Sequence, residues 1–206
     1  PGALGRDRAA PRGDVGTDPP GRRPVTDGAT VGLVLAAGAG TRFGRPKAPV
    51  VVRGERLVDH AVSCLRDGGC DRVVVVLGAW VGDVPGADVV VNPDWEQGMG
   101  SSLRAGLSSI RTDPHATRAL VSLVDLPGLT AAAVRRVLAT PGELVVATYA
   151  GQRGHPILFD RRHWDAVIEA AHGDEGARRF LHGREDLAWV EVGDVASGHD
   201  VDVPLE

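Results

Sequence analysis

A glycine-rich loop with several cations is the stretch of the sequence best suited to chemistry. Gly38, Gly40 and Gly44 can adopt backbone angles that other residues avoid, and they leave neighbouring amide N–H groups uncovered. Arg42 and Lys47 add positive charge to the same stretch. Amide groups and cations together suit the phosphates of a nucleotide, so we predict a phosphate-binding loop here. The alternative is a plain turn that needs glycine only for its geometry.

The two common glycine-rich nucleotide motifs do not fit this loop. Its G-x-G-x-x-x-G spacing is one residue longer than the dinucleotide fingerprint, and the next predicted strand, Val73 to Leu77, does not end in a ribose-binding acid. Lys47 lies between Pro46 and Ala48, whereas a Walker A lysine lies between Gly and Ser or Thr. An NAD or FAD enzyme and a P-loop enzyme are therefore disfavoured.

Two further segments carry polar residues beside predicted elements. Gly98, Gly100, Ser101 and Ser102 precede a predicted helix, whose first N–H groups could face a ligand, although either serine could simply cap the helix. Asp125 ends a predicted strand. A carboxylate at the carboxyl end of a parallel strand suits Mg2+ held together with phosphates. The alternative is an aspartate that only initiates the following Pro-Gly turn.

Alternating strands and helices must position these residues. An aliphatic run, Val31–Leu35, predicts a strand buried on both faces that leads directly into the glycine loop. Besides this strand and Val73–Leu77, the predicted strands are Asp88–Val91, Ala119–Asp125, Leu144–Thr148 and Ile157–Phe159, and further helices are Leu57–Arg66, Thr130–Leu138, Arg162–Ala171 and Gly176–Leu181. Because parallel strands need right-handed crossovers, we expect a doubly wound α/β sheet with ligands at the carboxyl ends of its strands.

The composition indicates an ordinary globular protein. The chain has 206 residues, of which 43% are hydrophobic, enough for one core. Residues 1–29 are poor in large apolar side chains and are predicted to be a disordered extension before one domain over residues 30–206. A net charge of -4 gives no support for a nucleic-acid partner, and no stretch suits a membrane span. Cys64 and Cys70 fit neither a zinc pair nor a redox motif, which favours reduced thiols and a cytoplasmic location.

Several blocks of sequence together resemble one family. The pattern L-A-A-G-x-x-x-R-x-G-x-x-K, from Leu35 to Lys47, resembles the loop of the MobA-like nucleotidyltransferases, and within that group the chain is most similar to the molybdenum cofactor cytidylyltransferases. Further matching blocks, in the family's order, are Gln97–Leu107, Val124–Pro127, Gly154–Pro156, Gly173–Leu181 and Asp200–Pro204. The resemblance implies a Rossmann-like fold of the nucleotide-diphospho-sugar transferase type, with a mostly parallel but mixed sheet.

The resemblance also implies roles for individual residues. Arg42, Lys47 and Asp125 would be catalytic, and His155, in a polar loop predicted over Tyr149–Pro156, would lie near a pterin acceptor unless it is an ordinary surface histidine. The implied nucleotide-binding residues are Leu35, Ala36, Ala37, Gly38, Gly40, Thr41, Arg42, Gly44, Lys47, Gly98, Gly100, Ser101 and Ser102.

The implied metal site combines Asp125 with an acid near the end of the sequence. Asp200 and Asp202 share one face of an extended segment, and of the two we choose Asp202 as the second Mg2+ ligand. The family usually continues with Thr and Glu where this chain has Val203 and Leu205. We therefore expect the metal role to be kept in altered surroundings.

The implied reaction transfers CMP from CTP to the terminal phosphate of molybdopterin cofactor and releases pyrophosphate. A phosphate nucleophile needs no general base, which agrees with the absence of nucleophile-elbow, zincin and cysteine–histidine motifs. The implied partners are an NTP and a phosphorylated acceptor, with a molybdoenzyme or its chaperone as a further partner. The alternatives are a guanylyltransferase, a transferase to another phosphorylated acceptor and a metal-dependent glycosyltransferase. A further alternative is a non-catalytic nucleotide-binding relative, or a relative recruited to oxidoreductase work, that binds nucleotide without turning over an NTP.

Overall fold

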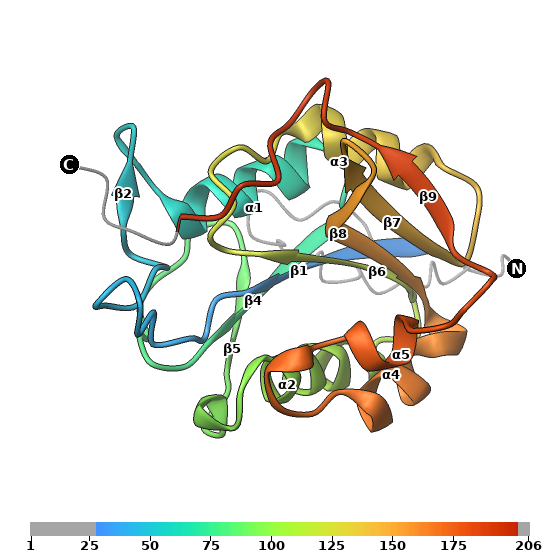
Figure 1. Cartoon of the computed structure of the whole chain (residues 1–206). Helices are drawn as coiled ribbons and strands as arrows, with labels where there is room; N and C mark the ends of the chain where they lie inside the picture. The colour runs from blue at the N-terminus through green and yellow to red at the C-terminus, as the bar shows by residue number, and fades with distance from the viewer. Residues whose placement is uncertain (1–27, 202–206) are drawn as a thin grey trace, which may run out of the picture.

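A central mixed sheet organises the molecule (Figure 1). The structure is a computed structural model and describes residues 28–201. The order of its strands is β5-β4-β1-β6-β8-β7-β9. Strand β8 is antiparallel to both of its neighbours, and the other neighbouring pairs are parallel. The strands are β1 Ala29–Leu35, β4 Arg72–Leu77, β5 Asp88–Val91, β6 Ala116–Leu123, β7 Leu144–Tyr149, β8 Gln152–Asp160 and β9 Ala188–Glu191.

Helices cover both faces of this sheet, as Figure 1 shows. Helices α1 Leu57–Asp67 and α3 Ala131–Ala139 lie on one face. On the other face lie α2 Met99–Arg111, α4 Trp164–Ala170 and α5 Arg178–Leu181. Short elements complete the described part: a hairpin of β2 Val51–Val52 and β3 Glu55–Arg56, and 3-10 turns η1 Trp95–Gln97, η2 Arg161–His163 and η3 Gly173–Glu175.

The central strands are buried because both of their faces pack against helices. All seven residues of β1 are buried, which explains its nearly continuous apolar sequence. Leu33 belongs to the core that includes α2 and α4, whereas Val34 belongs to the core that includes α1 and α3. Strands β1, β4, β6, β7 and β9 run in one direction, so their carboxyl ends share one edge of the sheet. Ligands of doubly wound folds bind at that edge.

The predicted doubly wound, mostly parallel sheet is confirmed, and the differences concern particular segments. Ala29, placed in the disordered extension, belongs to β1, while residues 1–27 lie outside the described range. Asp125 does not end a strand, since β6 stops at Leu123. The segment expected to be a polar loop before Pro156 is mostly strand β8. Strand β9 was not predicted.

The differences at β8 and β9 share a physical cause. The first residues of β8 are polar and partly exposed, so their side chains give no strand pattern, but their backbone pairs with β7. Strand β9 has only four residues and lies at an edge of the sheet. In both cases the pairing partner, rather than the local apolar pattern, stabilises the strand.

None of the helices between residues 28 and 201 combines the length and apolar character needed to cross a bilayer.

A carboxylate at the end of β9 binds the turn between β7 and β8. Glu191 accepts hydrogen bonds from the backbone N–H groups of Gly151 at 3.0 Å, Ala150 at 2.8 Å and Gly193 at 2.9 Å, and from the Thr148 hydroxyl at 2.8 Å. The bond from Gly151, followed by those from Thr148 and Ala150, lowers the pKa of Glu191 to about 2. The charged carboxylate therefore stabilises this corner of the sheet.

We expect Glu191→Gln to lower the melting temperature at pH 7 more than Glu169→Gln, a change of an exposed helical acid. Because folding lowers the pKa of Glu191 from 4.5 to about 2, its stabilising contribution is complete above pH 4.5 and is lost as pH falls toward 2. Thermal unfolding from pH 7 to pH 2 should show the difference between the variant and the parent shrinking over that window. A difference independent of pH would contradict a role for the charge.

Candidate active site

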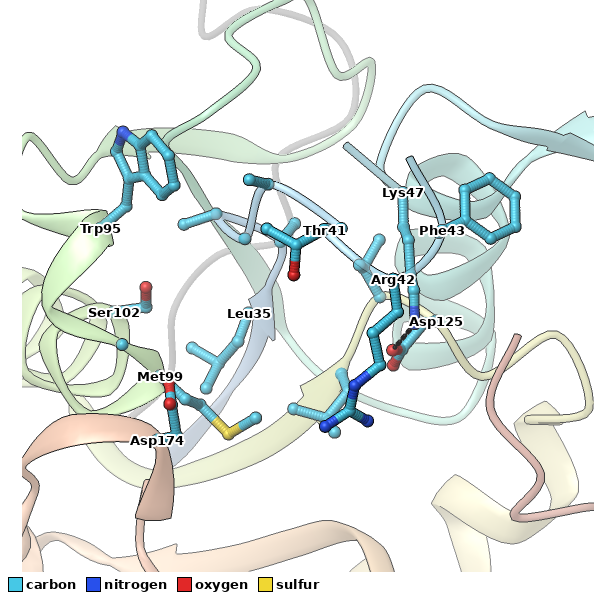
Figure 2. Close-up of a pocket in the computed structure, with 18 of the residues that line it drawn as sticks. Leu35, Thr41, Arg42, Phe43, Lys47, Trp95, Met99, Ser102, Asp125 and Asp174 are labelled. Atoms are coloured by element: carbon cyan, nitrogen blue, oxygen red, sulfur yellow. Dashed lines mark hydrogen bonds and ion pairs between the residues drawn. The ribbon is translucent and has the colours of Figure 1, made fainter. Parts of the chain in front are cut away.

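A cavity of about 500 Å3 opens at the carboxyl edge, beyond the ends of β1 and β6 (Figure 2). The last residue of β1 and the loop after it contribute Leu35, Ala36, Ala37, Gly38, Ala39, Gly40, Thr41, Arg42, Phe43 and Lys47 to its lining. The remaining lining residues are Trp95, Glu96, Gly98, Met99, Ser102, Leu123, Val124, Asp125, Asp174 and Asp200. Most of the predicted nucleotide-binding residues therefore share one cavity.

Backbone contacts hold the glycine loop at the mouth of this cavity. The Ala36 N–H donates to the Val76 carbonyl at 2.9 Å, and the Gly44 N–H donates to the Gly40 carbonyl at 2.8 Å. Gly40 has a φ of +61°, and a Cβ there would lie 2.1 Å from the Arg45 carbonyl oxygen, so glycine is required. A Cβ at Gly38 would have no atom within 4 Å. The loop thus leaves space over Gly38 for a ligand.

An ion pair joins this loop to the turn after β6. The Lys47 Nζ lies 2.8 Å from Asp125 Oδ2, and the two side chains are 13% and 19% exposed. In Figure 2, Arg42 lies on the same side of the cavity as this pair. Two cations and a carboxylate therefore gather at one end of the cavity, which is an arrangement suited to phosphates and a divalent ion.

The C-terminal segment reaches the same place. The Val201 N–H donates to the Asp125 carbonyl at 3.1 Å, and the preceding residue, Asp200, lines the cavity. Asp202, which we predicted as the second metal ligand, lies outside the described residues. Within the described part, Asp200 is the acid of this segment that reaches the cavity.

Two carboxylates in the cavity are candidates for binding a divalent metal ion. Residues 28–201 contain no group of three or more His, Cys, Asp or Glu side chains placed to hold a metal ion. Asp125 and Asp200 nevertheless both line this cavity, and carboxylates are hard donors. Mg2+ is commonly bound by one or two carboxylates together with substrate phosphates and water, so these residues fit such an ion.

The start of α2 differs from its predicted form. The helix begins at Met99, so Ser101 and Ser102 lie in its first turn and neither is the N-cap. The Asn92 side-chain amide donates to both hydroxyls, at 2.8 Å to Ser101 and 3.2 Å to Ser102. Asn92 therefore holds the first turn of α2 at the end of β5.

Not every predicted nucleotide-binding residue reaches the cavity. Ser102 and Gly98 line it, but Ser101, Gly100 and Gly44 do not. Ser101 donates its hydroxyl hydrogen bond to the Gly98 carbonyl at 2.8 Å. A Cβ at Gly100 would lie 2.7 Å from the His172 backbone nitrogen, so that glycine is needed for packing.

Sequence reasoning missed several lining residues. Trp95, Met99 and Asp174 had no assigned role, although Asp174 lies in one of the blocks that resemble the family. Their order along the chain gave no sign that they face the glycine loop. The glycines at 173 and 176, both with positive φ, are the signal that this segment makes a tight turn.

His155 lies outside this cavity. Its carbonyl accepts a hydrogen bond from the Tyr149 hydroxyl at 2.6 Å. Desolvation, followed by the nearby Arg153 charge, lowers the pKa of His155 to about 4, so its ring is neutral at pH 7. The preceding residues Arg153 and Gly154 line a second cavity.

This second cavity has a volume of about 550 Å3 and lies at the carboxyl ends of β7 and β9. It is lined by Tyr149, Ala150, Gln152, Arg153, Gly154, Glu191, Gly193, Ala196, Ser197, Gly198 and His199. His199 lines this cavity, and the next residue, Asp200, lines the first one. The two cavities therefore lie on either side of one short segment.

The chain is similar in sequence to several named proteins, among them an oxidoreductase and a guanylyltransferase. It is 40% identical over 188 residues to the nicotine blue oxidoreductase of Paenarthrobacter nicotinovorans, covering 83% of this chain and 91% of that protein. It is 29% identical over 169 residues to the molybdenum cofactor guanylyltransferase of Rhizobium meliloti, covering 77% of each.

Solved structures and a family match complete the comparison. The crystal structure of Rv0371c from Mycobacterium tuberculosis has a TM-score of 0.72 and 31% identity, covering 86% of this chain and 95% of that one. The Rv0371c complex with manganese has a TM-score of 0.66 and 30% identity, covering 80% and 88%. Residues 32–188 match the MobA-like NTP transferase domain. The chain therefore belongs to the MobA-like NTP transferase family and is a nucleotidyltransferase of that type.

Proposed function

We propose that the protein transfers CMP from CTP to the terminal phosphate of molybdopterin cofactor and releases pyrophosphate. The observation that carries this proposal is the cavity in which the glycine loop, Arg42 and the Lys47–Asp125 pair meet. A relative is named molybdenum cofactor guanylyltransferase, which supports this class of acceptor. The choice of CTP over GTP rests on the resemblance to cytidylyltransferases, and a guanylyltransferase is the second candidate. A cytoplasmic location belongs to the same proposal.

Positioning and charge neutralisation supply the catalysis in this proposal. The amides of the glycine loop, Arg42 and Lys47 bind the triphosphate. Asp125, together with Asp200 or Asp202, would hold Mg2+, which when bound neutralises charge on the phosphates. The similar protein Rv0371c has been solved in complex with manganese, which supports a divalent metal ion as cofactor.

The bond changes balance without a general base. An oxygen of the acceptor phosphate attacks the α-phosphorus, and the bond from that phosphorus to the bridging oxygen breaks. Pyrophosphate leaves with the electron pair. A phosphate monoester has its second pKa near 6, so it is already ionised at neutral pH.

We assign the acceptor to the second cavity. Its position next to Asp200 would place a bound acceptor beside the α-phosphate in the first cavity. Arg153 is the cation of its lining, and among the described residues it forms no ion pair with a carboxylate. An anionic group of the acceptor would provide that missing partner. His155 follows the cavity-lining residues Arg153 and Gly154, which supports its predicted place on the acceptor side.

The chain is 40% identical to a protein named as an oxidoreductase. The rival hypothesis is therefore a protein of this family that binds an NTP but does not transfer a nucleotide from it. The decisive experiment measures pyrophosphate release with each of the four NTPs and Mg2+, with and without molybdopterin cofactor. We expect pyrophosphate to be released from CTP only when molybdopterin cofactor is present. A preference for GTP would favour the guanylyltransferase, and NTP binding without any turnover would favour the rival.

We expect Asp125→Ala to reduce the rate of pyrophosphate release by about 100-fold or more, because it removes a proposed metal ligand. Asp194→Asn is the control, since it changes an acid in an exposed ion pair with Arg136. Circular dichroism and the melting temperature should show that both variants remain folded. Full activity of Asp125→Ala would contradict the metal-binding role, and loss of its fold would mean that Asp125 is a structural residue.

We expect Arg153→Gln to raise the KM for the acceptor by about tenfold while leaving the KM for the NTP unchanged. The matched control is Arg135→Gln, because Arg135 is exposed on α3 and donates to the Asp67 carbonyl. Steady-state kinetics with each substrate varied in turn provide the measurement. An equal change in both KM values would contradict the assignment of the second cavity to the acceptor.

A further inference from the structure

The first cavity has two chemically different ends. Its lining contains two cations, Arg42 and Lys47, and Figure 2 shows both beside Asp125. On the other side of the cavity the same figure shows Ser102 and Asp174, together with Trp95 and Met99. A triphosphate bound at the cationic end would therefore extend its nucleoside toward Ser102 and Asp174.

Close backbone packing fixes Asp174 at that end. A Cβ at Gly98 would lie 2.5 Å from the Gly173 carbonyl carbon and 2.6 Å from Asp174 Oδ1. On the same side, a Cβ at Gly100 would lie 2.7 Å from the His172 backbone nitrogen. Glycines at the start of α2 thus let η3 approach it closely. Asp174 comes from a segment more than 120 residues after the glycine loop, yet it faces the same cavity.

Asp174 is exposed at the wall of the cavity, so its carboxylate is open to a ligand or to water. Between residues 28 and 201 its carboxylate accepts no hydrogen bond and forms no ion pair. An ionised carboxylate only accepts hydrogen bonds, and it repels phosphate. Metal cations aside, the group that it can recognise must therefore carry O–H or N–H donors. Ribose hydroxyls, the exocyclic amino group of a nucleobase and, in guanine and uracil, a ring N–H are the donors that an NTP offers.

We propose that Asp174 recognises the nucleoside part of the bound NTP by accepting a hydrogen bond from a ribose hydroxyl or from the amino group of the base. This inference rests on the proposed function only in placing the triphosphate at the cationic end. It assigns to η3 a part in choosing the nucleotide, beside the residues of the glycine loop. Glu175, the next residue of η3, does not line the cavity and offers a matched comparison.

The test compares binding of two probes by calorimetry in the presence of Mg2+. One probe is the NTP that the parent protein binds most tightly, and the other is inorganic tripolyphosphate, which has no nucleoside. Asp174→Ala should weaken NTP binding by about 10- to 100-fold and leave tripolyphosphate binding unchanged. Glu175→Gln should change neither affinity. An unchanged NTP affinity in Asp174→Ala, or equal weakening for both probes, would overturn the inference.

Nucleotide analogues then identify the donor. If the partner is a ribose hydroxyl, the 2′-deoxy or 3′-deoxy NTP should bind the parent as weakly as the normal NTP binds Asp174→Ala, with no further loss in the variant. If the partner is the amino group, the same behaviour is expected of UTP relative to CTP, or of ITP relative to GTP. A loss in the variant that is equal for all analogues would contradict either contact.

These measurements separate the inference from the proposed function. Binding that depends on Asp174, in a protein that releases no pyrophosphate, would support nucleoside recognition and overturn the transferase proposal. Pyrophosphate release that is insensitive to Asp174→Ala would do the reverse. A parent protein that binds neither probe would overturn both.

Discussion

The ion pair between Lys47 and Asp125 is the contact on which the cavity depends. It joins two loops that are 78 residues apart in the chain, at a distance of 2.8 Å. Both side chains are largely shielded from water, so each charge needs the other to offset its desolvation. The pair therefore holds the loop after β1 and the turn after β6 in one arrangement. It also reduces the net negative charge that Asp125 would otherwise present to phosphates.

Backbone hydrogen bonds extend this arrangement to the C-terminal segment. The Val201 N–H binds the Asp125 carbonyl, and the Ser197 N–H binds the Gly128 carbonyl. The turn after β6 thus contacts the glycine loop on one side and this segment on the other. Because consecutive residues of the segment line different cavities, a donor nucleotide and an acceptor could meet across it. One turn therefore connects the parts of the site that come from distant sequence.

Elements with a strong local pattern were predictable, and those stabilised by distant partners were not. The aliphatic runs of β1 and β4 and the periodic apolar residues of α1 identified these elements directly. Strand β8 begins with polar residues and β9 is short, so only their pairing within the sheet makes them strands. Glu191 could not be recognised for the same reason, because its four donors come from β7, the turn after β7 and the turn after β9.

The sequence by itself determined the family and predicted a phosphate-binding loop, because glycine geometry, nearby cations and the order of motifs are local properties. Only the tertiary structure decided that Lys47 pairs with Asp125 and that Asp174 and Asp200 enter the cavity. It also decided that Gly100 packs against the backbone of residue 172 and does not line the cavity. Contacts between distant segments depend on strand order and on the packing of helices against the sheet, which local patterns do not encode.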